Sequence, residues 1–110
     1  MTRIQLIEKL RTRSDVGVAD DAQSWRIYIS KGRDLVCEVM VPHDVLEWYA
    51  SVTHRRDKKV LWSDWMDYSG YDDRPREQLE VEMARDLWAF IDRASIKEPL
   101  LPIKIYEESG

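Results

Sequence analysis

The stretch from residue 60 to residue 73, VLWSDWMDYSGYDD, constrains the fold more than any other part of the chain. Its first nine residues alternate at the period of two that is typical of a β-strand. One predicted face carries Val60, Trp62, Asp64, Met66 and Tyr68, and the other carries Leu61, Ser63, Trp65 and Asp67. The pattern predicts a central strand whose aromatic residues belong to the core, followed by an acidic loop.

Asp64 is the exception in this predicted strand, because it falls in the middle of an otherwise apolar face. A buried carboxylate without a partner costs a large amount of free energy. We therefore expect one of two arrangements. Either a β-bulge turns Asp64 outward, or a buried donor holds its carboxylate.

The length of the chain is that of a single domain with one hydrophobic core, since it has 110 residues. No apolar run approaches the roughly 18 residues of a membrane span. The N-terminal segment MTRIQLIEKLRTR lacks the long apolar region of a signal peptide. The single cysteine, Cys37, cannot form an internal disulfide, so we expect a cytoplasmic protein.

The charge of the chain is modestly acidic, with a formal net charge of −4. Residues 60–73 contain four aspartates and no Lys or Arg, whereas residues 55–59 (RRDKK) carry four bases and one acid. We interpret the basic run as a solvated loop, because it has no interleaved aromatic residues or glycines. The charge distribution argues against nucleic acid as a partner and is compatible with a basic protein.

Hydrophobic periodicity predicts an α+β fold in which an about four-stranded, mainly antiparallel sheet packs against two or three helices. The expected helices are residues 3–12, 43–54 and 75–94, and the expected strands are residues 24–30, 34–41, 60–68 and 103–106. Residues 31–33 form a hairpin turn in this prediction, and residues 14–23 form a polar connection. The middle helix depends on Val45, Trp48, Tyr49 and Val52, which are spaced as i, i+3, i+4 and i+7.

Motifs for catalysis, cofactors or metals are not recognisable in the chain. Its four glycines are scattered singly, so they cannot build a phosphate-binding loop. One cysteine and two distant histidines, His43 and His54, do not have the spacing of a zinc site. Cys37 shares the inward-facing set of its strand and is expected to be a small buried hydrophobic residue. We therefore expect no cofactor, no metal and no enzyme activity.

Three features together carry a resemblance to a known group of proteins: a Pro-His-Asp start at Pro42, the LWSDWMDY strand, and the long final helix. With these features the chain resembles the small immunity proteins of bacterial polymorphic and contact-dependent growth inhibition toxin systems. The resemblance implies that the chain binds a cognate toxin domain in the cytosol and neutralises it. Many such toxins are nucleases with basic surfaces, which immunity proteins cover with acidic and aromatic residues. The resemblance implies no catalytic residues in this chain.

The residues themselves favour a protein-binding surface, since aromatic side chains supply buried contact area and carboxylates supply steering. We expect this surface to contain Asp64, Trp65, Asp67, Tyr71, Asp72 and Asp73. One alternative is a small ligand-binding or enzymatic domain with a pocket lined by Trp62, Trp65 and Asp64. Another is a structural homodimer subunit that buries tryptophans at a symmetric interface, so the chain is expected to be a monomer or a homodimer.

Overall fold

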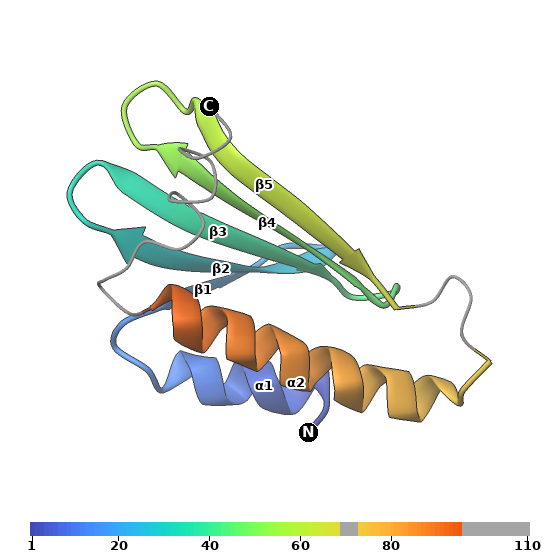
Figure 1. The fold of residues 1–110 in the computed structure, drawn as a ribbon. Coiled ribbons are helices and arrows are strands. Elements are labelled where there is room, and N and C mark those ends of the chain that lie inside the picture. Colours follow the sequence, from blue (N-terminus) through green and yellow to red (C-terminus); the bar gives the residue numbers. More distant parts are fainter. Residues whose placement is uncertain (69–72, 96–110) are drawn as a thin grey trace.

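The computed structural model describes residues 1–68 and 73–95. These residues form two helices, α1 (Arg3–Arg11) and α2 (Arg76–Ala94), and five strands (Figure 1). The strands are β1 (Gly17–Asp20), β2 (Ser24–Lys31), β3 (Leu35–Pro42), β4 (Glu47–His54) and β5 (Val60–Asp67). Each strand pairs antiparallel with the next one in the chain, in the order β1-β2-β3-β4-β5. The expected α+β class is confirmed, with five strands and two helices in the described residues.

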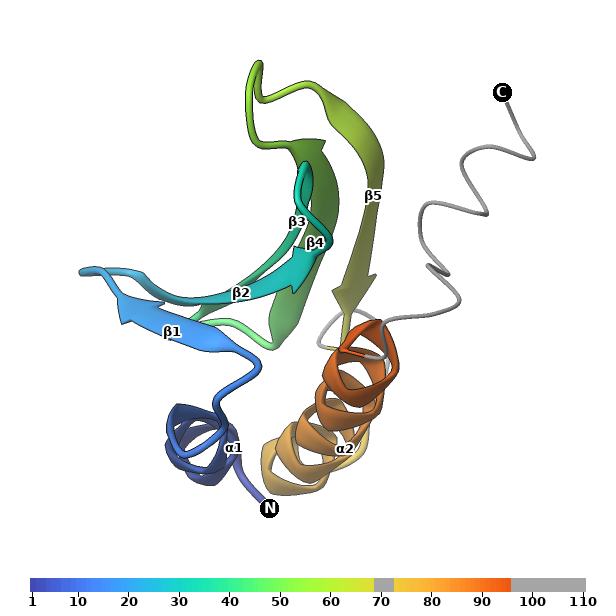
Figure 2. The same cartoon turned by 90° about the vertical axis from the view of Figure 1, so that its left-hand side faces the viewer.

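The two helices lie side by side on one side of a strongly curved sheet (Figures 1 and 2). Among the described residues no element covers the other side of the sheet, which we call the open face. Alternate residues of β2, β3 and β4 point toward the helices and are buried. They are Ile27 and Ile29 in β2; Cys37, Val39 and Val41 in β3; and Ala50 and Val52 in β4. Full burial of one such aliphatic side chain contributes roughly 1.5–3 kcal/mol. The alternation predicted for β2 and β3 is confirmed, and so is the inward position of Cys37.

Helix α1 begins with a capping box, in which Thr2 accepts a hydrogen bond from the Gln5 backbone and Gln5 accepts one from the Thr2 backbone. Next to it, the buried Arg3 donates hydrogen bonds from Nη1 to the carbonyl oxygens of Pro42 (2.8 Å) and Val45 (3.0 Å). Its Nε lies 3.3 Å from Oε1 of Glu80 in α2. Arg3 therefore ties α1 both to the β3–β4 connection and to the other helix.

Residues 43–54 do not form the expected helix, because Glu47–His54 is strand β4. The helical stripe contains Tyr49, which is exposed, whereas the strand buries a set with a period of two: Leu46, Trp48, Ala50 and Val52. The segment satisfies both periodicities, and the strand prevails because its backbone bonds to β3 and β5 on its two sides. Tertiary pairing of this kind routinely overrides local propensity.

Three further expectations concern residues 14–23, 60–68 and 103–106. The predicted connection at 14–23 contains β1, which pairs with β2 through the register Gly17↔Tyr28 to Asp20↔Trp25. The strand predicted at 60–68 is confirmed as β5, but it lies at one edge of the described sheet rather than in the centre. The strand expected at 103–106 lies outside the described residues.

Candidate functional site

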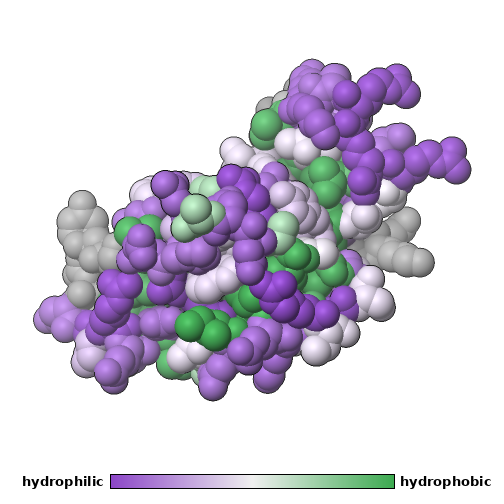
Figure 3. Space-filling model, turned by 180° about the vertical axis from the view of Figure 1, so that it is seen from behind, coloured by the Kyte–Doolittle hydropathy of each residue, from purple (hydrophilic) through white to green (hydrophobic). Residues whose placement is uncertain are grey.

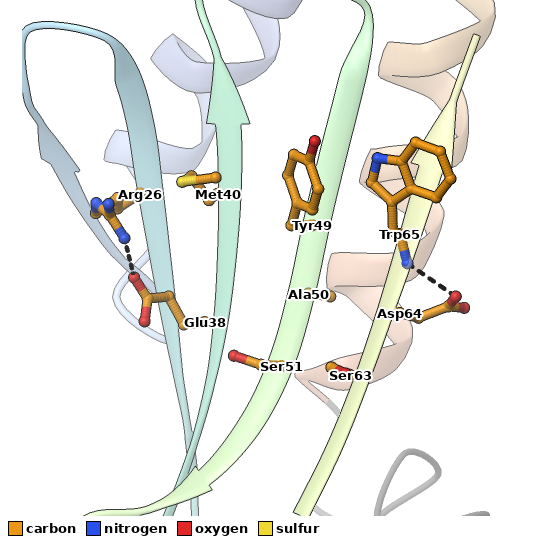
Figure 4. A pocket seen from close by; sticks show the side chains of 9 residues that line it. All are labelled: Arg26, Glu38, Met40, Tyr49, Ala50, Ser51, Ser63, Asp64 and Trp65. Atoms are coloured by element: carbon orange, nitrogen blue, oxygen red, sulfur yellow. Dashed lines mark hydrogen bonds and ion pairs between the residues drawn. The ribbon is translucent and has the colours of Figure 1, made fainter. Parts of the chain in front are cut away.

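A cross-strand row of side chains runs over the open face from β2 to β5 (Figure 4). The register pairs Arg26 with Met40, Met40 with Tyr49, and Tyr49 with Trp65. These side chains project to the side opposite the helices, which lie behind the sheet in the same view. The row therefore places one cation, one thioether and two aromatic rings along a single line across four strands.

Tyr49 and Trp65 form the apolar centre of this row. Their ring centroids are 6.3 Å apart, with an angle of 27° between the rings. The adjacent backbone bond from the Tyr68 N–H to the Leu46 carbonyl oxygen makes Leu46 and Tyr68 a hydrogen-bonded pair. Hydrogen-bonded and non-hydrogen-bonded pairs alternate along an antiparallel ladder, so Tyr49 and Trp65 form a non-hydrogen-bonded pair. Side chains approach most closely in such pairs, which explains the stacking.

Carboxylates surround the two rings. The hydroxyl group of Tyr49 donates a hydrogen bond of 2.6 Å to Oε2 of Glu47, and this hydrogen bond raises the pKa of Tyr49. Glu47 lies opposite Asp67 in the register, so two acidic residues flank the stacked pair at one end of β4 and β5. Both carboxylates therefore add negative charge beside the stacked rings.

Arg26 at the other end of the row is held by two acids. Its Nη1 lies 2.7 Å from Oε1 of Glu38, and its Nε lies 3.0 Å from Oδ2 of Asp21. Backbone N–H groups of Gln23 and Ser24 also donate to Asp21. The Gln23 backbone hydrogen bond, followed by Arg26, holds the pKa of Asp21 well below its usual range. Arg26 is therefore engaged within the sheet, and the apolar contact area of the row lies at Tyr49 and Trp65.

The row borders an open hollow of about 480 Å³ whose lining includes Arg26, Glu38, Met40, Tyr49, Ser51, Ser63 and Trp65. The described part of the chain contains no group of three or more His, Cys, Asp or Glu side chains placed to hold a metal ion. Cys37 lies on the helix side of the sheet, where burial raises the pKa of its thiol to about 11. The exposed aromatic pair and its carboxylates are suited to contact with another molecule.

Asp64 takes neither of the two expected arrangements. The register shift in β4–β5 lies at Val52/Thr53, so no bulge is present at Asp64, and Asp64 is exposed rather than buried. Its Oδ1 accepts a hydrogen bond of 2.8 Å from the backbone N–H of Trp65. Figure 4 places this carboxylate on the outer side of β5. The charge thus keeps contact with water although its Cα partner, Ala50, is buried.

The six residues expected in the binding surface are only partly brought together. The side chains of Trp65 and Asp67 lie on the open face, whereas the side chain of Asp64 leaves β5 on the opposite side. Asp73 is exposed just before α2, and Tyr71 and Asp72 lie outside the described residues.

The residues of the open face that were not expected from the sequence include Met40, Tyr49 and Glu47. The helix predicted at 43–54 removed Tyr49 and Glu47 from the sheet, and with them the neighbours of Met40 in the row. The alternation of Tyr49 with Trp48 and Ala50 was the available signal, since a period of two places Tyr49 on the face opposite these buried residues.

Of the three residues of the pocket considered as an alternative, Asp64 and Trp65 line the open hollow and Trp62 does not. Trp62 points toward the helices, where its ring stacks on Phe90 with centroids 6.1 Å apart. Trp65 points to the open face, where it stacks on Tyr49. Residues separated by an odd number of positions in a regular strand face opposite sides, so Trp62 and Trp65 do not line a common cavity.

The basic run at 55–59 lies in the β4–β5 hairpin, at the end of β5 opposite to Asp67. The backbone N–H of Arg55 donates to the Asp34 carbonyl oxygen at 2.8 Å, which joins this hairpin to the β2–β3 hairpin. In Figure 3 the hairpin end of the molecule projects as a strongly hydrophilic surface. The bases of this run therefore lie at the end of β4 and β5 opposite to Glu47 and Asp67.

No helix among residues 1–68 and 73–95 is long and apolar enough to cross a membrane. Comparison with models of protein families, with curated proteins and with solved structures found no match. Function is therefore inferred from the geometry of the open face.

Proposed function

We propose that this chain is a protein-binding inhibitor, an immunity protein that neutralises a cognate toxin domain in the cytosol, and that it is not an enzyme. The observation that carries the proposal is the exposed stack of Tyr49 on Trp65, flanked by Glu47 and Asp67. Trp65 is 50% exposed, which is unusual for so large an aromatic side chain in a strand. An exposed aromatic pair with an acidic border is typical of an interface centre.

The aromatic pair is suited to act as an anchor because it is already ordered. Each ring is fixed by its neighbour and by the strand register, and the Tyr49 hydroxyl is fixed by Glu47. Less side-chain entropy is then lost when a partner covers the rings. The hollowed surface lined by Met40, Tyr49 and Trp65 offers contact area to a side chain or a short segment of the partner.

The charge of the surface supports a basic partner. Glu38, Glu47 and Asp67 lie on or beside the open face, where Arg26 is already paired with Glu38 and Asp21, and the whole chain carries a formal net charge of −4. Such a surface accelerates encounter with a basic protein and disfavours acidic ones. Many toxins of these systems are nucleases with basic surfaces, so we propose a nuclease domain as the class of partner.

The test is neutralisation and binding of a toxin domain encoded beside this gene. Co-expression of the chain should relieve the growth arrest that the toxin domain causes. Trp65→Ala and Tyr49→Ala should each raise the dissociation rate, at a cost of about 2 kcal/mol or more if these residues are hot spots. Ile4→Ala is the matched control, because Ile4 is an exposed hydrophobic residue on α1, away from the open face.

The charges are tested separately from the anchor. Glu47→Gln with Asp67→Asn should lower the association rate and flatten its dependence on salt, with little change in dissociation. Thermal melts of every variant identify those that have lost their fold. Full neutralisation by a folded Trp65→Ala, Tyr49→Ala double variant would reject the open face as the interface.

A further inference from the structure

From Trp62 onward, strand β5 has a regular pattern of inward and outward backbone groups. The Tyr68 N–H donates to the Leu46 carbonyl oxygen, and the register continues through Trp48↔Met66 and Ala50↔Asp64. Even-numbered residues of this part of β5 therefore direct their backbone groups at β4. The backbone groups of Ser63, Trp65 and Asp67 point away from the sheet, because these residues form the alternate pairs.

This outer edge has the features of a strand that can pair with another chain. β5 has eight residues and no proline, and within the described residues no strand lies on its outer side. Val60, Trp65 and Met66 are exposed by 52%, 50% and 40%. Long, apolar edge strands are sites of edge-to-edge association unless the protein protects them.

Asp64 protects this edge at its centre. Its Oδ1 accepts the hydrogen bond of the outward-pointing Trp65 N–H at 2.8 Å. A strand approaching from outside needs that N–H as a donor for its own ladder. It would have to displace a charged acceptor, and charge-assisted hydrogen bonds are stronger than neutral ones.

The same carboxylate opposes self-pairing by its charge. Two copies of β5 pair antiparallel only if outward-pointing residues face each other, so the numbers of opposed residues must add to an even sum. Two such registers cover β5 equally well, because each pairs seven of its eight residues. One sets Asp64 opposite the Asp64 of the second copy, as a non-hydrogen-bonded pair with Cα atoms about 4.5 Å apart. The other sets Ser63 opposite Ser63 and Asp64 opposite Trp62, which leaves the two aspartates as diagonal neighbours about 7–8 Å apart. Both registers bring the two like charges together on one face, and the first does so most closely.

We infer that Asp64 is a guard residue, which prevents β5 from pairing with β5 of a second copy and keeps this edge of the sheet monomeric. The β5 edge is thus a latent self-association surface, and the second copy is its occupant once the carboxylate is removed. The inference does not depend on the proposed function, because it concerns the edge of β5 and not the open face.

The first experiment compares the mass of variants in solution by sedimentation across a range of concentrations. Wild type should sediment as a monomer, whereas Asp64→Ala should shift toward twice the mass as concentration rises. Asp64→Asn removes the charge but keeps an acceptor for the Trp65 N–H, so its shift should be weaker. Asp67→Ala is the matched control on the same strand, and it should remain a monomer because residue 67 opposes Leu61 in one of these registers and lies beyond the paired residues in the other.

The second experiment tests the geometry of the dimer. Ser63→Pro removes an outward N–H that β4 does not use, so its addition to Asp64→Ala should restore the monomer without loss of the fold. In the register that sets residue 64 opposite itself, Asp64→Cys places two thiols within disulfide distance, whereas Asp67→Cys does not. Disulfide dimers should form much faster from Asp64→Cys, while the buried Cys37 stays unreacted.

Three results would overturn the inference. One is that wild type already pairs through β5. The next is that folded Asp64→Ala and Asp64→Asn both remain monomeric. The last is that Ser63→Pro fails to reverse an association that Asp64→Ala produces, since that association would then use another surface.

Discussion

The hydroxyl group of Tyr68 donates a hydrogen bond of 2.9 Å to Oδ2 of Asp86, which joins the end of β5 to the middle of α2. The hydroxyl oxygen of Tyr68 also accepts a hydrogen bond of 3.3 Å from Nε1 of Trp48. Tyr68→Phe leaves the buried Nε1 of Trp48 without this acceptor and removes a donor from Asp86, so we expect it to lower the free energy of unfolding by about 1–2 kcal/mol. Urea unfolding measures this loss. Tyr28→Phe on the open face is the control, and an equal loss there would contradict the explanation.

The contribution of Tyr68 should depend on pH. Burial, together with the hydrogen bond to Asp86, raises the pKa of Tyr68 to about 12 from its usual 10.0. The folded state therefore keeps the phenol neutral to a higher pH than the unfolded chain does. This contribution is complete below the unfolded pKa of about 10 and is lost as the pH rises through about 12. The stability difference between wild type and Tyr68→Phe should shrink over that window, and a constant difference would disprove the coupling.

Arg3 should contribute far more to stability than Arg11, although both lie in α1. Arg3 is buried and donates to two backbone carbonyl oxygens, and it also pairs with Glu80. Arg3→Ala strands these acceptors and should cost about 2–3 kcal/mol. Arg11 makes an exposed ion pair with Asp20, so Arg11→Ala should cost less than about 1 kcal/mol. Similar melting temperatures for the two variants would refute this ranking.

Lys58 in the β4–β5 hairpin has a φ of 62°, in the left-handed region that favours glycine. Lys58→Gly should therefore raise the free energy of unfolding by about 0.5–1 kcal/mol, since relief of the left-handed strain exceeds the extra entropy of the unfolded glycine. Lys59→Gly removes the same charge at a residue without this backbone conformation, and it should not stabilise the protein. A thermal melt of each variant tests the difference.

The thiol of Cys37 should be unreactive in the folded protein. Cys37 is fully buried, and burial raises its pKa to about 11, so little thiolate forms at neutral pH. A thiol-labelling reagent should react slowly under native conditions and rapidly in denaturant. Fast labelling of the native protein would mean that the sheet opens locally between β2, β3 and β4.

Several elements are predictable because their signals are local. The last helix carries a single long apolar stripe, and α2 buries Leu79, Met83, Leu87 and Ile91 from it. The β2–β3 hairpin follows from two alternating runs joined by a short turn, in which Gly32 adopts a φ of 76°. The alternation of residues 60–68 also assigns Trp62 and Trp65 to opposite faces of β5, and their separate ring partners, Phe90 and Tyr49, confirm the assignment.

The candidate site is only partly predictable because it depends on which period residues 43–54 follow. Trp48 and Val52 belong both to the helical stripe and to the strand alternation, so hydrophobic spacing alone does not separate the two structures. Pairing of this segment with β3 on one side and β5 on the other decides for the strand. Only that pairing brings Tyr49 against Trp65 and creates the open-face surface.

The side of β5 on which Asp64 lies follows from the sequence, whereas the exposure of Asp64 follows from the tertiary structure. The alternation of residues 60–68 by itself assigned Asp64 to the same side of the strand as Trp62 and Met66, and the register confirms this side. Whether that side is buried depends on the position of β5 at the edge of the described sheet and on where α2 lies. Strand periodicity is a property of neighbouring residues, whereas the cover over a sheet comes from elements distant in the chain. The sequence therefore determined the direction of the carboxylate, and the packing of the elements decided that it meets water and the Trp65 N–H.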